Sequence, residues 1–236
     1  MTAEEIVEEL KPLGRESYKR VLIPHGIREP FFGVKIEDMK ARFQKKIKMD
    51  YKLALDLYDT GIYDAMYLAG LIADDAKMTK ANLKHWAKGA YCGALAQYTV
   101  PWVASGSPHG HDIAVEWIES TKELVAVAGW STFSSLMATK DDSDLDTTEL
   151  ARLLTRIGKT IHDQPNLVRY VMNGFVIAAG SYVVTLTELA LAVADKVGTV
   201  HVDMGGTSCK VPTAREYIER VRTRGTIGKK RRSAKC

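Results

Sequence analysis

Cysteine is scarce in this chain of 236 residues, which holds only Cys92, Cys209 and Cys236. The number is odd and no two cysteines have the CxxC spacing, so neither a disulfide framework nor a zinc ribbon is supported. Cys92 lies in an apolar stretch, where a buried structural thiol is far more common than a nucleophile. We therefore expect a reducing compartment.

Long hydrophobic runs are also missing, because no stretch of about eighteen uncharged apolar residues occurs. The first ten residues carry four glutamates instead of the basic and apolar regions of a signal peptide. We expect a protein that is neither secreted nor membrane-spanning, and therefore a cytoplasmic one. With 46% hydrophobic and 26% charged residues, the composition is that of a folded globular protein.

Motifs of nucleotide and hydrolase chemistry are absent as well, since the chain has no GxxxxGKS/T loop, no strand-linked GxGxxG and no GxSxG elbow. The densest group of potential metal ligands is His109–Gly110–His111–Asp112. It lacks a further ligand at a recognisable spacing, and its glycine and the preceding Pro108 are typical of a connection between helices. We predict neither a metal nor another cofactor.

Positive charge is concentrated at one end of the sequence. Residues 214–236 hold nine Lys or Arg against two Glu, a net charge of +7, so the rest of the chain carries −3 of the total of +4. Such a basic segment attracts a polyphosphate through counterion release. A solvated, disordered end is the alternative interpretation, because basic tails are common and carry no sequence-specific information by themselves.

Helical patterns dominate what remains. Apolar residues recur at helical spacing over 50–59, 63–73, 111–119, 123–137, 150–161, 167–180 and 186–196. Four pairs have an N-cap residue followed three positions later by glutamate: Thr2/Glu5, Ser120/Glu123, Asp146/Glu149 and Thr213/Glu216. The chain is therefore expected to be all-α, with many helices of two to four turns.

A weak repeat runs through these segments. Gly70, Gly129 and Gly174 each follow an apolar stretch, 59 and 45 residues apart, near the period of about 40–47 residues of HEAT-type helical repeats. Because glycine costs a helix about 1 kcal/mol, its repeated use predicts close approach between helices. We predict a HEAT-like or armadillo-type α-solenoid of stacked antiparallel helix pairs over residues 1–225, followed by a basic tail, 226–236. A non-repetitive helical bundle is the alternative.

Two further features have both structural and functional interpretations. Residues 199–211 alternate in side-chain character around Gly205–Gly206, which predicts a short β-hairpin that would fit a nucleic-acid groove or merely cover the last helix pair. The four tryptophans lie within or beside helical patterns, so each is expected in the core, with a stacking platform for a base as the alternative: Trp86, Trp102, Trp117 and Trp130.

The segment 31–40, Phe-Phe-Gly-Val-Lys-Ile-Glu-Asp-Met-Lys, is followed by a basic stretch through Lys48. Here the sequence resembles the HEAT-like-repeat DNA alkylation-repair family, the AlkD-like alkylpurine DNA glycosylases. The helix pair over 53–73, the Val100–Pro101 step and the pair over 114–136 follow in the family's order, so the likeness covers roughly residues 20–200. It implies a protein that binds duplex DNA on a concave face and cleaves the glycosidic bond of cationic alkylpurines without a cofactor.

The resemblance also implies a cleft in which a carboxylate stabilises an oxocarbenium-like sugar between aromatic side chains. In the family these residues lie just before the step that corresponds to Val100–Pro101. Here the carboxylate position is Gln97, the nearest preceding aromatic residue is Tyr91, and a second family aromatic matches Phe175. A glutamine supplies no negative charge, and losing such a stabiliser commonly costs roughly 10² to 10³ in rate. The catalytic residue is therefore left unassigned.

These observations predict a DNA-binding protein of this family that recognises damaged, distorted or branched double-stranded DNA, with little or no base excision. The expected DNA contacts are basic: Arg42, Lys45, Lys46, Lys48, Lys229, Lys230, Arg231 and Arg232. One alternative is an active glycosylase in which Asp112 or Asp64 has taken the lost role, and another is a protein-binding scaffold. No motif supports homodimerisation, so a monomer is expected.

Overall fold

The computed structural model describes residues 1–47, 49–207 and 209–235, so the predictions made for Lys48 and Cys236 lie outside the described residues. Its α-helices are α1 Ala3–Leu10, α2 Glu16–Leu22, α3 Ile36–Met39, α4 Tyr51–Asp59, α5 Tyr63–Ile72, α6 Lys80–Gly89, α7 Val100–Gly106, α8 Gly110–Trp117, α9 Glu123–Thr139, α10 Thr147–Thr160, α11 Asn166–Tyr182, α12 Thr187–Val197 and α13 Ala214–Thr223.

Shorter turns connect these helices. Two are π-helical, η3 Lys40–Gln44 and η5 Leu95–Thr99. Six are 3₁₀ turns: η1 Lys11–Leu13, η2 Ile23–His25, η4 Asp75–Lys77, η6 Asp142–Asp144, η7 Ile161–Asp163 and η8 Val184–Leu186. Within the described residues, no single helix combines the length and apolar composition of a membrane span, and only α11 and α12 pass together, across a bend of 118°.

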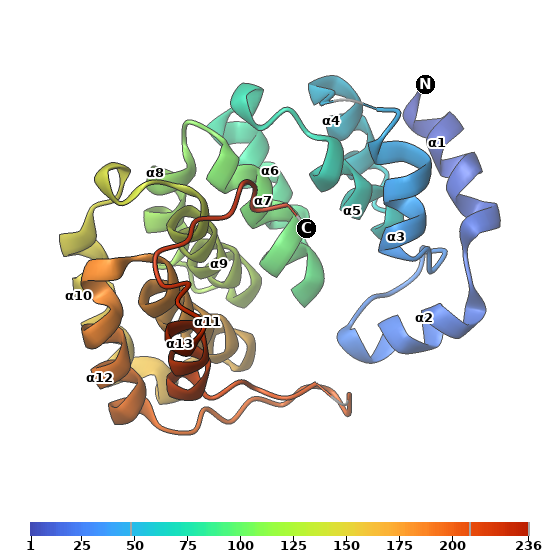
Figure 1. Ribbon diagram of the computed structural model, residues 1–236. Coiled ribbons are helices and arrows are strands. Elements are labelled where there is room, and N and C mark those ends of the chain that lie inside the picture. The colour runs from blue at the N-terminus through green and yellow to red at the C-terminus, as the bar shows by residue number, and fades with distance from the viewer. Residues whose placement is uncertain (48, 208, 236) are drawn as a thin grey trace.

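The helices form stacked antiparallel pairs, as the sequence predicted. Outer helices α4, α8, α10 and α12 pack on inner helices α5, α9, α11 and α13 (Figure 1). Inner helix α11 also packs on α9 and α13, whereas α5 packs on η5 and α7. Outer helix α10 buries one stripe, Leu150, Leu153, Leu154 and Ile157, whereas every residue of inner helix α5 is buried. This difference follows from their places, because an inner helix is covered on more than one side. The predicted α-solenoid is confirmed.

The glycines of the weak repeat do not all act alike. A Cβ on Gly70 would lie 2.7 Å from the side chain of Thr99, and one on Gly129 would lie 2.7 Å from the backbone nitrogen of Ile118. At these two positions the predicted close approach of helices is real. A Cβ on Gly174 would meet nothing within 4 Å. Gly174 therefore faces open space, and close helix approach is wrong as its explanation.

Two of the four predicted helix caps form. Thr2 and Glu5 make a reciprocal capping box at α1, and the Asp146 carboxylate accepts the Glu149 amide at α10. Glu123 has a longer-range partner, because its Oε1 accepts the backbone N–H of Leu167 at 2.7 Å. This bond satisfies one of the free donors at the start of α11 and ties two inner helices together.

Residues 199–207 and 209–211 form an extended arm with a tight turn at Gly205–Gly206, and these described residues contain no strand (Figure 1). The prediction of a β-hairpin is therefore wrong, because the two sides of the arm are not paired as strands. The predicted turn at Gly205–Gly206 is confirmed. The physical reason lies in α11, since Asn166 exchanges two hydrogen bonds with the backbone of Asp203 and Asn173 donates to the Pro212 carbonyl. The arm is held by these side chains rather than by a ladder.

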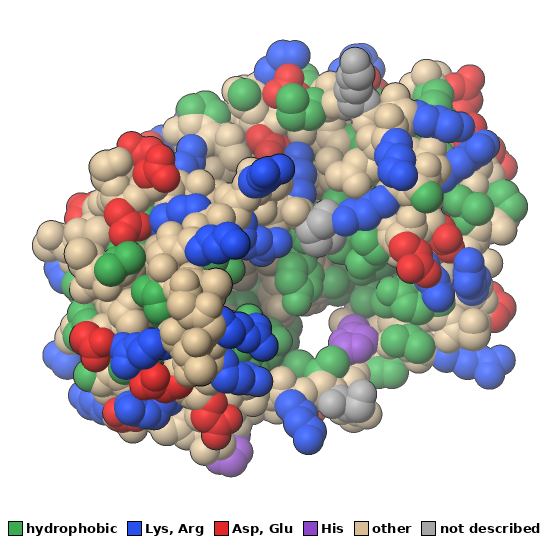
Figure 2. Space-filling model, in the orientation of Figure 1, with side chains coloured by type: hydrophobic (Ala, Val, Ile, Leu, Met, Phe, Trp, Pro, Cys, Tyr) green, Lys and Arg blue, Asp and Glu red, His purple; other side chains and the backbone are tan. Residues whose placement is uncertain are grey.

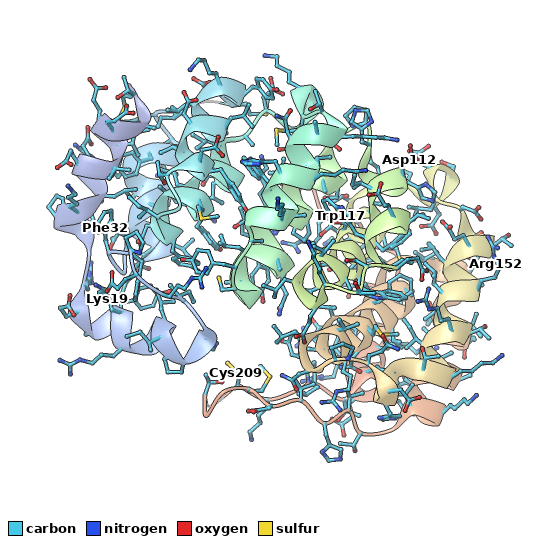
Figure 3. All side chains as sticks on the ribbon, turned by 180° about the vertical axis from the view of Figure 1, so that it is seen from behind. Lys19, Phe32, Asp112, Trp117, Arg152 and Cys209 are labelled. Atoms are coloured by element: carbon cyan, nitrogen blue, oxygen red, sulfur yellow. The ribbon has the colours of Figure 1, made fainter. Side chains whose placement is uncertain are left out.

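The arm reaches across the molecule to the other end of the solenoid. A Cβ on Gly205 would lie 2.6 Å from the carbonyl oxygen of Pro24, in η2, so the two backbones touch there. Figure 2 shows the result as an opening through the molecule, bounded below by the arm. Figure 3 shows the same arm from behind, with Cys209 near its tip.

Candidate nucleic-acid interface

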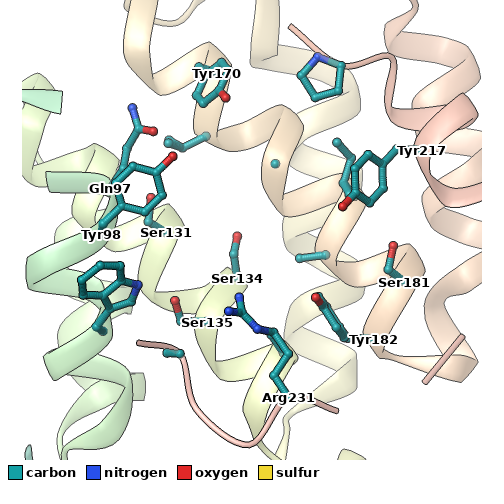
Figure 4. Close-up of a pocket in the computed structure, with 18 residues that line it drawn as sticks. Gln97, Tyr98, Ser131, Ser134, Ser135, Tyr170, Ser181, Tyr182, Tyr217 and Arg231 are labelled. Atoms are coloured by element: carbon teal, nitrogen blue, oxygen red, sulfur yellow. The ribbon is translucent and has the colours of Figure 1, made fainter. Parts of the chain in front are cut away.

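A cavity of about 290 Å³ lies among η5, the inner helices α9, α11 and α13, and the C-terminal tail (Figure 4). Hydroxyl groups dominate its polar lining: Ser131, Ser134, Ser135, Ser181, Tyr98, Tyr170, Tyr182 and Tyr217. Gln97 and Arg231 complete that polar lining, and no Asp or Glu is among the described residues that line the cavity. The cavity therefore suits a neutral or anionic ligand better than a cationic one.

The π-helical turn η5 sets the direction of Gln97 and Tyr98. The Val100 amide donates to the carbonyl of Leu95, five residues earlier, instead of four. Pro101 follows directly, and its ring nitrogen cannot donate to the carbonyl of residue 97, so the regular ladder is interrupted here. Such π-turns re-aim side chains and are frequent at functional sites. The turn brings two consecutive residues, Gln97 and Tyr98, to one cavity.

The basic tail is ordered and forms one wall of this cavity. Gly228 donates to the Ser181 carbonyl, Arg231 donates to the Ala138 carbonyl at 2.7 Å, and both bonds use the tail's backbone. The tail thus crosses from α11 to the end of α9 (Figure 1). The interpretation of the tail as a solvated, disordered end does not hold for residues 226–235.

Two lysines anchor the tail at helix C-termini. The Lys230 ammonium lies 2.7 Å from the Asp142 carboxylate and donates to the Met137 carbonyl in the last turn of α9. The Lys235 ammonium lies 2.8 Å from the Asp75 carboxylate and donates to the Ala73 carbonyl at the end of α5. Both placements also suit the negative end of the helix dipole.

The remaining basic tail residues, Lys229, Arg231 and Arg232, are exposed. Within the described chain, the ion pairs of the tail involve Lys230 and Lys235. None of them involves Lys229, Arg231 or Arg232. Lys and Arg side chains gather over the tail on one side of the central hollow and over α3–η3 on the other (Figure 2). Two basic rims therefore flank this hollow on the face shown. We call the tail side, with Lys229, Arg231 and Arg232, the C-terminal rim, and the side of α3–η3, with Arg42, Lys45 and Lys46, the N-terminal rim.

The predicted DNA contacts on the N-terminal rim have different surroundings. Arg42 is bound to the Glu9 carboxylate at 2.7 Å. Lys45 and Lys46 are exposed, and no ion pair involves them within the described part of the chain. Of the eight basic residues predicted to contact DNA, Lys230 serves instead as a tail anchor whose side chain is only 17% exposed.

The three residues predicted to form a cleft are not brought together. Gln97 lines the cavity. Tyr91 lies elsewhere, with its hydroxyl on the Arg28 carbonyl and its ring 4.8 Å from the Arg28 guanidinium. Phe175 is fully buried and packs edge-on against Trp130 and Phe133. Its assignment to the cleft is wrong, because successive residues of a helix point about 100° apart and here Gly174 faces the cavity.

Two other aromatic residues line the cavity: Tyr98, which was not predicted to take part, and Trp102, which was predicted in the core or as a stacking platform. Tyr98 directly follows Gln97, and its ring is 46% exposed. Trp102 lies one helical turn further, with its ring 5.9 Å from that of Tyr98. Their spacing of four residues was a readable signal, since such residues share a helix face. All four tryptophans are core residues, as predicted, and Trp102, which is 5% exposed, also lines the cavity.

Neither carboxylate considered as a replacement catalytic group lines the cavity. Asp64 is fully buried, and its two oxygens accept the backbone N–H groups of Phe32 and Val34 at 2.6 and 2.8 Å. Burial raises its pKa although these hydrogen bonds lower it. Asp112 is exposed on outer helix α8, where it pairs with Lys80 at 2.8 Å (Figure 3). Lys80 holds the pKa of Asp112 below its usual value.

Histidine takes part in ion pairs rather than in a cluster of ligands. His111 lies 2.6 Å from the Glu149 carboxylate and 3.7 Å from that of Asp112. Among the described residues, no three His, Cys, Asp or Glu side chains converge in an arrangement that would hold a metal ion. Cys92 is buried, and burial raises the pKa of its thiol, which is the environment of a structural cysteine.

Comparisons with known proteins agree on one relationship. A family model described as DNA alkylation repair enzyme matches residues 6–218. Uncharacterized proteins from Listeria innocua and Listeria monocytogenes are each 31% identical over 229 residues, which covers 95% of this chain and 99% of theirs. A solved structure, described as a new family of proteins related to the HEAT-like repeat DNA glycosylases with affinity for branched DNA structures, is 36% identical, with a TM-score of 0.92 over 100% of both chains.

Proposed function

Because the chain belongs to the DNA alkylation repair enzyme family, we propose that it binds branched DNA without excising bases. The observation that carries this proposal is a cavity with no Asp or Glu among its described lining residues, beside a hollow with two basic rims. A duplex presents a regular polyphosphate surface, and cations on opposite sides of a hollow contact separate arms of a branched molecule. The structural relative is itself described as having affinity for such DNA.

The groups at the cavity support the part of the proposal that concerns base excision. The position that resembles the family carboxylate is Gln97, whose amide cannot supply a negative charge to an oxocarbenium-like sugar. Asp64 is committed to a loop of the N-terminal part, and Asp112 lies on an outer helix. Neither carboxylate is among the described residues that line the cavity. This placement counts against an active glycosylase.

A binding titration tests the proposal. Purified protein is titrated into labelled linear duplex, three-way junction and four-way junction of equal length, at about 50 mM and about 200 mM salt. We expect tighter binding to the junctions than to the duplex, and an affinity that falls steeply with salt. A methylated duplex incubated in parallel should release no base. Base release would assign the protein to the glycosylases, and no DNA binding at low salt would favour a protein-binding scaffold.

Matched charge reversals locate the interface. Lys45→Glu with Lys46→Glu changes two exposed cations of the N-terminal rim, and Arg152→Glu changes an exposed cation on outer helix α10, seen in Figure 3. We expect the double variant to weaken junction binding and to flatten its salt dependence, because two phosphate contacts are lost. The α10 variant should bind as the parent does. Equal effects of the two variants would place the DNA elsewhere.

A further inference from the structure

The cavity beside the tail has a chemical character of its own. Its polar groups are hydroxyls, the amide of Gln97 and the guanidinium of Arg231, which reaches into it from the tail (Figure 4). The tail backbone fixes Arg231, because its N–H is bonded to the Ala138 carbonyl at 2.7 Å. Guanidinium and hydroxyl groups are the groups that bind phosphate, and no described Asp or Glu shares the lining of this cavity with them.

Ser181 is a buried polar residue in the lining of this cavity. Its side chain is only 3% exposed, and its hydroxyl oxygen is buried with no hydrogen-bond partner. A buried polar group without a partner costs about 1–3 kcal/mol, so such groups are normally satisfied by protein, water or ligand. Ser181 lies in the cavity lining on α11, next to Tyr182 in the sequence (Figure 4).

Aromatic rings provide the apolar part of the site. Tyr98 and Trp102 project from successive turns of one helical segment, with their ring centroids 5.9 Å apart, and 46% of Tyr98 is exposed. A base stacks on such a ring with about 1–3 kcal/mol per base, whatever its sequence. Opposite them, Gly174 leaves room, since a Cβ there would meet nothing within 4 Å.

The combination of a phosphate-binding guanidinium, an unsatisfied hydroxyl and an exposed aromatic ring matches one nucleotide. We propose that this cavity takes a single unpaired nucleotide at the branch point of the DNA, with its phosphate at Arg231 and its base against Tyr98. A paired nucleotide cannot enter, because its base is stacked and bonded within the duplex. The inference rests on the proposed branched-DNA binding and explains how a branch is distinguished from a continuous duplex.

The test compares two three-way junctions of the same arms, one fully paired and one with two unpaired nucleotides at the branch. The parent protein should prefer the second by roughly tenfold, since one stacked base and one phosphate contact are together of that order. The readout is the ratio of the two affinities, because loss of one rim cation weakens binding to both junctions alike. Arg231→Gln should abolish the preference, so that both junctions bind equally. Arg232→Gln is the matched control, because this neighbouring exposed arginine does not line the cavity.

Gly174→Leu provides a second, uncharged test. The new side chain would fill the cavity from open space and, being a better helix former than glycine, should not unfold α11. Its thermal unfolding midpoint, measured beside that of the parent, checks the fold. Loss of the preference for unpaired nucleotides in this variant supports the proposal. Retention of the preference in either cavity variant overturns it.

The outcomes separate this inference from the proposed function. Junction binding that ignores unpaired nucleotides contradicts the inference alone, whereas failure to bind any junction contradicts the proposed function. A deoxynucleoside monophosphate, a deoxynucleoside and inorganic phosphate are titrated separately, with amide chemical shifts of the cavity residues as the readout. Weak binding of the monophosphate alone supports a site for one nucleotide. If the monophosphate bound with micromolar affinity but did not compete with the junction for the protein, the cavity would be a site for a free nucleotide, and the inference would be overturned.

Discussion

Gly129 and Gly174 occupy equivalent places in a weak sequence repeat but have opposite surroundings. An alanine methyl at position 129 would meet Trp117 and Ile118 at 2.7–2.9 Å, whereas one at position 174 would meet nothing within 4 Å. Because alanine favours a helix over glycine by about 0.5–1 kcal/mol, Gly174→Ala should raise the free energy of unfolding by about that amount. Gly129→Ala should lower it by about 1–3 kcal/mol through overpacking. Urea denaturation measures both, and destabilisation by Gly174→Ala would contradict the open cavity.

Asp75 makes part of the stability dependent on pH. Burial raises the pKa of its carboxyl from 3.8 to about 6, against the lowering effect of Lys235. The folded protein therefore binds this proton more tightly than the unfolded chain, so the stability that it contributes is complete below pH 3.8 and is lost as pH rises through about 6. Relative to Asp75→Asn, the parent's free energy of unfolding should fall over this range by on the order of 3 kcal/mol. Parallel pH dependences of the two proteins would refute this.

The same proton affects the end of the tail. Below a pH of about 6 the Asp75 carboxyl is neutral, so the Lys235 ammonium loses its counter-charge and keeps only the Ala73 carbonyl. We expect faster amide hydrogen exchange at residues 229–235 at pH 5 than at pH 7.5, after correction for the intrinsic rate. Lys235→Gln should show the faster exchange at both pH values. Exchange that is equally slow in this variant would mean that the anchor does not hold the tail.

At the scale of the element, the tail divides its cations between structure and solvent. Lys229→Glu with Arg232→Glu reverses two exposed charges, and we expect DNA affinity and salt dependence to fall together, because each lost phosphate contact reduces the slope by about 1. Lys230→Gln should instead loosen the tail, since its ammonium is bound to Asp142 and Met137. Hydrogen exchange distinguishes the two effects, and an unchanged salt slope in the charge-reversed variant would exclude the tail from the DNA.

The helices themselves were largely predictable from sequence. The spans expected over 63–73 and 123–137 correspond to α5 and α9, because apolar spacing and composition decide an inner helix. The conformation of the arm could not be predicted in the same way. Its turn is encoded by neighbouring glycines, but its hydrogen-bond partners are Asn166 and Asn173 on α11, which is distant in sequence. Nor could a pattern show that the tail is ordered, because its anchors Asp75 and Asp142 lie far away in sequence.

The candidate site was predictable only in part. Gln97 was found from its place before Val100–Pro101 and does line the cavity. Phe175 was selected beside Gly174, but a shift of one residue along a helix exchanges a cavity-facing position for a core position. The roles of the serines and of Arg231 depend on three helices and the tail meeting in space. No spacing within a single segment contains that information.

At the scale of the whole molecule, the tip of the arm matters most. In an ordinary solenoid each repeat touches only its neighbours, so the terminal repeats fray and stability is a sum of local contributions. Here Gly205 abuts Pro24, and Lys235 reaches back to Asp75, so the end of the chain is tied to its beginning. The array is closed, and neither end is free to unfold by itself. A helical-repeat protein with tied ends should therefore unfold as one cooperative unit, rather than lose its terminal repeats first.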